Sequence, residues 1–228
     1  VACGTNTRPP SEYLPAAPPG EGADGLLRWF SEFTKRFEEG TYVHRPMVNE
    51  DRDSWGICLF PAQGAELSRC VTRGVEVTAS CIYMPEHRAQ GWGYSLAFRL
   101  LGTAEERGFQ TCQLDTRIWN VELEGEERDT VRGDGVIGFF PILTDGGWIC
   151  NLESDPHSQY EVEGRTRKSS HVIPGEFRYQ SCSQGSRSMR GQFSGTLLMV
   201  PGTRKKPTGE PFHATLNPFR LYIPDFIY

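Results

Sequence analysis

The chain has 228 residues, of which 37% are hydrophobic and 23% charged, and its formal net charge is −5 at pH 7. This length allows one large domain or two small ones with a globular core, and the negative charge speaks against general binding to nucleic acids or membranes. We expect neither a secretory leader nor a membrane span, because no run of about 18 apolar residues occurs. The 25 glycines and 16 prolines indicate many turns, which favours β structure over helical bundles.

Seven cysteines occur, at positions 3, 58, 70, 81, 112, 150 and 182, and none forms a Cys-x-x-Cys motif. Several lie in apolar runs typical of strands. An odd number of cysteines in such surroundings predicts reduced, buried thiols. We therefore expect a cytoplasmic and/or nuclear protein.

The N-terminal part divides into a linker and a helix. Residues 1–23 are rich in proline and predict an extended linker or the end of a preceding domain. Asp24–Glu39 is predicted to be a helix, followed by Gly40 at its C-terminal end. Its apolar stripe consists of Leu26, Phe30, Phe33 and Phe37. The stripe packs either on this protein's own sandwich or on a part of the chain N-terminal to it, or else it docks a partner.

From Thr41 onward the apolar period changes from helical to alternating. Residues 24–66 are predicted to hold the helix and short strands that join the domains. Residues 67–228 are predicted to form a β-sandwich, with an inserted loop at about 144–170. The expected strands are Tyr42–His44, Ile57–Phe60, Val75–Tyr83, Tyr94–Leu100, Cys112–Leu123, Phe177–Gln180, Phe193–Val200, Phe212–Leu216 and Phe219–Ile223.

The apolar residues of Cys112–Leu123 change phase by one residue midway, which is the effect of a β-bulge. Glu124–Glu126 then predicts a hairpin turn. Pro218 predicts a kink or a break between the last two strands.

Val131–Gly138 contains the Gly-x-Gly-x-x-Gly spacing of dinucleotide-binding loops. The following residues, Phe139–Leu143, lack the helix that such a loop requires, so the glycines join extended segments. Either they meet a backbone need for positive φ and a tight crossing, or their N–H groups form an anion-binding nest for a nucleotide or pyrophosphate. The candidate ligand-binding residues are Arg132, Gly133, Asp134, Gly135 and Gly138.

No catalytic constellation occurs in the sequence. The hydrolase, P-loop and zinc-protease motifs are absent, and the histidines His44, His87, His157, His171 and His213 lack ligand spacing. We therefore expect a protein that is not an enzyme and that holds no metal or cofactor.

The order of several motifs resembles the ApaG domain over Leu67–Tyr228. The matching residues are Cys112–Trp119, Val131–Gly138, Pro141, Pro174, Gly175, Phe177, Tyr179, Ser181, Met189, Gly191, Phe212, Phe219, Leu221, Ile223 and Pro224. The resemblance implies an immunoglobulin- or fibronectin III-like β-sandwich, mainly β, with an N-terminal helix before it.

Further motifs are similar to those of plant F-box proteins that carry a C-terminal ApaG domain. These motifs are Gln180–Ser183, Val200–Gly202, Pro207–Gly209 and Ile223–Tyr228. The resemblance implies the substrate-recruiting C-terminal part of an F-box protein in a Skp1–cullin–F-box (SCF) ubiquitin ligase. Its partner would be a protein substrate, and a Skp1-type adaptor would bind only through an F-box outside this chain. A structural subunit of a larger assembly is a further possibility.

Overall fold

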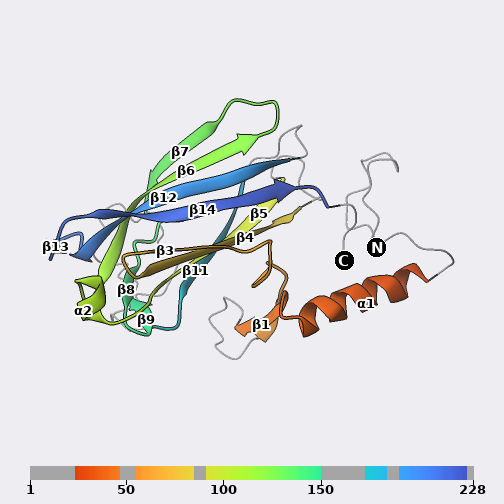
Figure 1. Ribbon diagram of the computed structural model, residues 1–228, viewed down its shortest axis with the longest axis horizontal. Coiled ribbons are helices and arrows are strands. Elements are labelled where there is room, and N and C mark those ends of the chain that lie inside the picture. The colour runs from red at the N-terminus through yellow and green to blue at the C-terminus, as the bar shows by residue number, and fades with distance from the viewer. Residues whose placement is uncertain (1–23, 47–54, 85–90, 150–172, 184–189, 225–228) are drawn as a thin grey trace, which may run out of the picture.

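The computed structural model describes residues 24–46, 55–84, 91–149, 173–183 and 190–224, and two antiparallel sheets dominate it. Figure 1 shows these sheets packed face to face, with the helix α1 lying apart from them. The prediction of a mainly β sandwich with an N-terminal helix is confirmed. The predicted linker, residues 1–23, lies outside the described residues.

The smaller sheet has four strands in the order β11-β5-β4-β3. Its strands are β3 (Ser68–Thr72), β4 (Val75–Tyr83), β5 (Trp92–Leu100) and β11 (Phe177–Ser183). Apolar residues alternate along β4 and β5 because successive side chains point to opposite faces of a sheet. One face of this sheet therefore lines the core, and the other carries polar side chains.

The larger sheet has eight strands, with β6 and β12 paired at its centre. Its strands are β6 (Cys112–Leu123), β7 (Asp129–Asp134), β8 (Ile142–Thr144), β9 (Gly147–Ile149), β10 (Ile173–Pro174), β12 (Arg190–Thr203), β13 (Lys206–Pro207) and β14 (Phe212–Tyr222). The first residues of the predicted 144–170 insertion thus form the β8–β9 hairpin. The rest of the insertion lies outside the described residues.

Two irregularities expected from the sequence are present. The pairing of β6 with β12 steps from Thr116 to Leu114, so Asp115 has no opposite residue and forms the bulge. The pairing of β12 with β14 is interrupted at Pro218, within a strand that continues on both sides. Proline cannot donate a ladder hydrogen bond, so it is placed where the pairing is broken.

The core lies between the two sheets and is rich in aromatic rings. Trp92, Leu96 and Phe98 of β5 face Leu197 and Phe193 of β12, and all five are buried. One open side of the sandwich is closed where β14 runs beside β3. There, Ser68 donates to the carbonyl of Asn217 at 2.7 Å, and the Thr215 amide donates to the Thr72 hydroxyl at 3.1 Å.

The helix α1 (Gly25–Glu38) contacts the residues after it near its C-terminal end. The rings of Phe33 and Tyr42 are tilted against each other with centroids 5.7 Å apart, and Arg36 Nη1 lies 3.6 Å from Glu66 Oε2. Leu26, Leu27 and Phe30 are 71%, 64% and 55% exposed. These three side chains therefore do not pack on the described part of the sandwich, and the partner of the stripe stays a prediction. Gly40 ends the helix with φ of +74°, as predicted.

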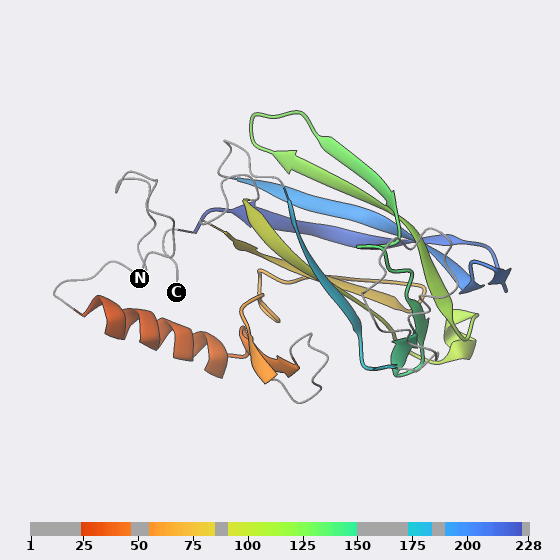
Figure 2. The same cartoon turned by 180° about the vertical axis from the view of Figure 1, so that it is seen from behind.

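A short hairpin and the segment after it cross the polar face of the four-stranded sheet. The hairpin pairs β1 (Val43–Pro46) with β2 (Trp55–Cys58) and lies below the sandwich in Figure 2. Side chains on the outward face of the sheet are nevertheless buried, among them Glu76, Ser80, Ser95 and Ala97. The predicted joining region, residues 24–66, thus includes a segment that covers this face.

A second helix, α2 (Ala104–Arg107), is not expected from apolar periodicity because it has only four residues. Thr103 and Glu106 form a capping box, and Gly108 ends the turn with φ of +79°. Buried Arg107 donates to the carbonyls of Leu101 and Gly102 at 3.1 and 2.6 Å. This turn connects the two sheets between β5 and β6.

Replacing Leu197 by alanine removes a fully buried side chain from the core and is expected to lower the free energy of unfolding by about 2–5 kcal/mol. The matched control is Leu26→Ala, because the Leu26 side chain is 71% exposed. The control should change stability by less than about 0.5 kcal/mol. Urea unfolding followed by tryptophan fluorescence measures both, and equal losses would contradict this placement of the core.

Candidate functional site

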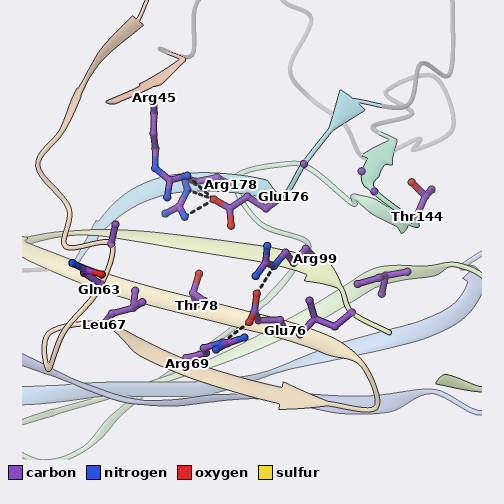
Figure 3. A pocket seen from close by; sticks show the side chains of 16 residues that line it. Arg45, Gln63, Leu67, Arg69, Glu76, Thr78, Arg99, Thr144, Glu176 and Arg178 are labelled. Carbon is purple, nitrogen blue, oxygen red and sulfur yellow. Dashed lines mark hydrogen bonds and ion pairs between the residues drawn. The ribbon is translucent and has the colours of Figure 1, made fainter. Parts of the chain in front are cut away.

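A cavity of about 780 Å³ lies on the outward face of the four-stranded sheet. Figure 3 shows its walls, which come from the sheet, the covering segment at Gln63 and Leu67, and the turn after Thr144. Its charged lining consists of four arginines and two glutamates, namely Arg45, Arg69, Arg99, Arg178, Glu76 and Glu176. We call these six residues the arginine pocket.

The strand register explains why these charges meet. Glu76 of β4 lies opposite Arg99 of β5, and both point away from the core because their neighbours Val75, Val77 and Phe98 point into it. By the same alternation, Arg69 of β3 and Arg178 of β11 point to the outward face. Four strand positions, one on each strand of the sheet, thus bring charged side chains to one surface.

Glu76 lies at one side of the pocket between two arginines. It is only 2% exposed, and it accepts hydrogen bonds from the Nε atoms of Arg69 and Arg99. The hydrogen bond from Arg99 to Glu76 raises the pKa of the Arg99 guanidinium above its ordinary value. A buried carboxylate needs such partners, because an unpaired buried charge is strongly destabilising.

Glu176 forms the second centre. It accepts from Arg45 Nη1 at 2.7 Å and from Arg178 Nη2 at 2.6 Å, and Arg178 also donates to the Ser95 hydroxyl at 2.7 Å. Burial opposes ionisation of Glu176, but the charges and hydrogen bonds of Arg178 and Arg45 outweigh it, so the pKa of Glu176 is lowered. Arg45 thereby fastens the β1–β2 hairpin to the sheet.

The pocket has a surplus of two positive charges when all six groups are ionised, since four arginines face two glutamates. Arg69 and Arg99 use their Nε atoms on Glu76, and none of their terminal nitrogens bonds another described residue. The Nε atom of Arg45 is buried and without a hydrogen-bond partner among the described residues. The arrangement can therefore receive an anion.

The glycine loop lies elsewhere, at the end of β7 in the eight-stranded sheet. Gly135 and Gly138 have φ of +55° and +80°, and Val136 and Phe139 exchange backbone hydrogen bonds of 2.9 and 2.8 Å across a tight turn. The Gly135 amide donates to the carbonyl of Asp115, the bulge residue, at 2.7 Å. These contacts give the glycines a backbone role.

Space around the loop also requires glycine. A Cβ atom at Gly135 would lie 2.4 Å from the carbonyl oxygen of Phe139, and one at Gly133 would lie 2.8 Å from Arg117 Nη1. Arg117 crosses Gly133 and donates to the carbonyls of Asp134 and Gly135 at 3.1 and 2.6 Å. Arg132 and Asp134 are exposed. The contacts seen here explain the glycines without a ligand. Ligand binding stays a prediction for the five residues named above, Arg132, Gly133, Asp134, Gly135 and Gly138.

The thiols within the described parts of the chain are all free, namely Cys58, Cys70, Cys81, Cys112 and Cys182. Burial raises the pKa of the Cys81 and Cys112 thiols to about 12, so neither is a thiolate at neutral pH. Among the same residues, no group of three or more His, Cys, Asp or Glu side chains is placed to hold a metal ion, and no helix has the length and apolarity to cross a membrane.

The sequence analysis names none of the six charged residues of the arginine pocket as site residues. A partial signal exists, because Glu76, Arg99 and Arg178 occupy the polar positions of predicted strands. The strand order and register that place them together are not visible in the sequence. Arg45 and Glu176 are 131 residues apart.

We expect Gly135→Ala to destabilise the protein more than Gly125→Ala. Both glycines have positive φ, +55° and +79°, but a Cβ atom at Gly125 meets nothing within 4 Å. Conformational strain alone costs about 1 kcal/mol, and the contact with the Phe139 carbonyl adds to it only at Gly135. The denaturant midpoints of the two variants compare their losses of stability. Equal losses would show that the close contact at Gly135 does not affect stability.

The variant Glu176→Gln tests the ion pairs around Glu176 through the pH dependence of the free energy of unfolding. The pKa of Glu176 is lowered from 4.5, so its contribution to stability is complete above that value and is lost as pH falls through the folded-state pKa. At neutral pH the wild type should be more stable than the variant by about 1–3 kcal/mol. The difference should shrink below pH 4.5. Urea unfolding over this range checks it, with exposed Glu127→Gln as the control; a difference independent of pH would contradict the charged pair.

No family model matches the chain. It is 28% identical over 215 residues to F-box protein SKIP16 of Arabidopsis thaliana, an alignment that covers 90% of this chain. The chain spans 42% of the length of that relative.

The chain also aligns with shorter proteins. It is 29% identical over 160 residues to Protein ApaG of Anaeromyxobacter dehalogenans, covering 69% of this chain and 97% of that protein. A crystal structure of the ApaA protein of Bordetella pertussis aligns with 66% of the chain at 21% identity and a TM-score of 0.45. The chain is therefore a homologue of the ApaG proteins and of F-box protein SKIP16, as its motifs predicted.

Proposed function

We propose that this chain is a non-catalytic protein-binding module that recruits substrates to an SCF ubiquitin ligase. The observation that carries the proposal is the alignment of 90% of the chain with an F-box protein. Under this proposal, a Skp1-type adaptor binds through an F-box outside these 228 residues, and ubiquitin transfer is performed by other subunits.

Two surfaces of the structure support a binding role. The arginine pocket is a charged cavity open to a ligand, with its side chains held in place by paired carboxylates. The exposed side of α1 presents Leu26, Leu27 and Phe30. Apolar side chains gathered on one face of a helix are typical of a protein contact.

The proposed location is the cytoplasm and/or the nucleus, where such ligases act. The five free thiols of the described residues suit a reducing compartment. We further propose that nucleic acids and membranes are not partners, given the net charge of −5.

The proposal predicts that the purified, immobilised chain retains specific proteins from a cell extract of the organism to which the sequence belongs. Those proteins should accumulate in cells when cullin-based ubiquitin ligases are inhibited, because their turnover depends on recruitment. Quantitative mass spectrometry measures both retention and accumulation. An immobilised bacterial ApaG protein serves as the control bait. Retention no greater than that of the control, or retained proteins whose abundance does not respond, would contradict the proposal.

A further inference from the structure

We infer that the arginine pocket binds the phosphoryl group of a phosphoserine or phosphothreonine in a protein substrate. The inference rests on the proposed function, because it names the kind of protein that the module recruits. Arg45, Arg69, Arg99 and Arg178 are the residues that hold the phosphate.

The first reason is that the arginines are already held in position. In Figure 3, Glu76 lies between Arg69 and Arg99, and Glu176 lies against Arg45 and Arg178. A guanidinium group has five N–H donors in a planar fork, so an arginine that uses Nε on a carboxylate keeps donors for a second anion. Side chains ordered before binding lose less conformational freedom when the ligand arrives.

The second reason is the match of charge. The pocket has a surplus of two positive charges, from four arginines and two glutamates. A phosphorylated side chain carries a charge of about −1.5 to −2 at neutral pH, whereas a carboxylate carries only one negative charge. Arg69 and Arg99 are 58% and 49% exposed, so their remaining donors are accessible to a ligand. The pocket therefore suits a phosphate dianion better than an acidic side chain.

The third reason separates a peptide from a nucleotide. The residues that line the cavity include no aromatic side chain, so no aromatic ring in this part of the described structure offers a nucleobase a stacking surface. Gly146, Gly147 and Gly175 line the same cavity. Because glycine has no side chain, these positions leave space beside the phosphate for the backbone of an extended peptide. A volume of about 780 Å³ leaves room for residues on either side of the phosphate.

The experiment compares two fluorescent decapeptide libraries with random flanking residues, one with a central phosphoserine and one with a central serine. Fluorescence anisotropy measures binding to the intact chain. We expect binding of the phosphoserine library that weakens as salt is raised, and no binding of the serine library. Equal binding of both libraries would overturn the inference.

Single-residue variants test the location. In Arg69→Gln, Glu76 keeps Arg99, and in Arg45→Gln, Glu176 keeps Arg178, so each buried carboxylate retains one partner. Each variant should weaken phosphopeptide binding by tenfold or more. The matched control is Arg128→Gln, since Arg128 is 54% exposed and pairs through Nε with Glu122 at 3.4 Å outside the pocket. It should bind within twofold of the wild type. Melting temperatures within a few degrees of the wild type verify folding.

Unchanged binding by both pocket variants would overturn the inference, as would an equal loss in the control. Inorganic phosphate and O-phosphoserine are added as competitors to distinguish the source of the phosphoryl group. The inference expects both to compete at least 100-fold more weakly than the peptide. If inorganic phosphate or O-phosphoserine competed at concentrations similar to that of the peptide, the pocket would be assigned to a small phosphorylated molecule. That result would overturn the assignment to a protein substrate.

The same variants separate this inference from the proposed function. If Arg69→Gln and Arg45→Gln retain the same cellular proteins as the wild type, the pocket inference fails while the recruiting role stands. If the wild type binds phosphopeptides but retains no protein that responds to ligase inhibition, the recruiting role fails while the phosphate site stands.

Discussion

The alternation of side chains along β4 and β5 is the constraint on which the rest of the structure depends. Their inward residues, such as Val77 and Leu96, supply the core against the large sheet, while outward Glu76 and Arg99 form the base of the arginine pocket. Because the side-chain period of a strand is two, a one-residue slip would exchange the two sets. Core packing therefore fixes the register that also assembles the pocket.

The glutamates of the arginine pocket, on the outward face of the four-stranded sheet, form ion pairs with arginines. Glu76 and Glu176 are each bound by two arginines, one pair drawn from β3 and β5 on either side of β4 and the other from the hairpin and β11. Burying a carboxylate costs free energy that its arginines offset, and the excess of arginine leaves a positive field at the surface. The ion pair between Arg45 and Glu176, which fastens the β1–β2 hairpin to the sheet, thus also shapes a surface for anions.

Much of the fold is predictable from local patterns. The alternation of Val75–Tyr83, the phase change between Ile118 and Trp119 and the stripe of Leu26–Phe37 predict a strand, a bulge and a helix, and the structure has all three, with the bulge at Asp115. The spacing of Gly133, Gly135 and Gly138 marks a special backbone, and its lack of a following helix favours the turn that is seen. The four-residue helix α2 has no apolar period, so only its capping residues could predict it.

The sequence by itself determined the β-sandwich, the homology to ApaG proteins and the glycine turn, because each depends on residues that are close along the chain or in a fixed order. Only the tertiary structure decided the arginine pocket and the exposure of α1. Arg45 reaches Glu176 across 131 residues, and Arg69 meets Arg99 through Glu76 on a neighbouring strand. Contacts of this kind depend on strand order and register. Long-range packing sets both, and no local sequence pattern encodes them.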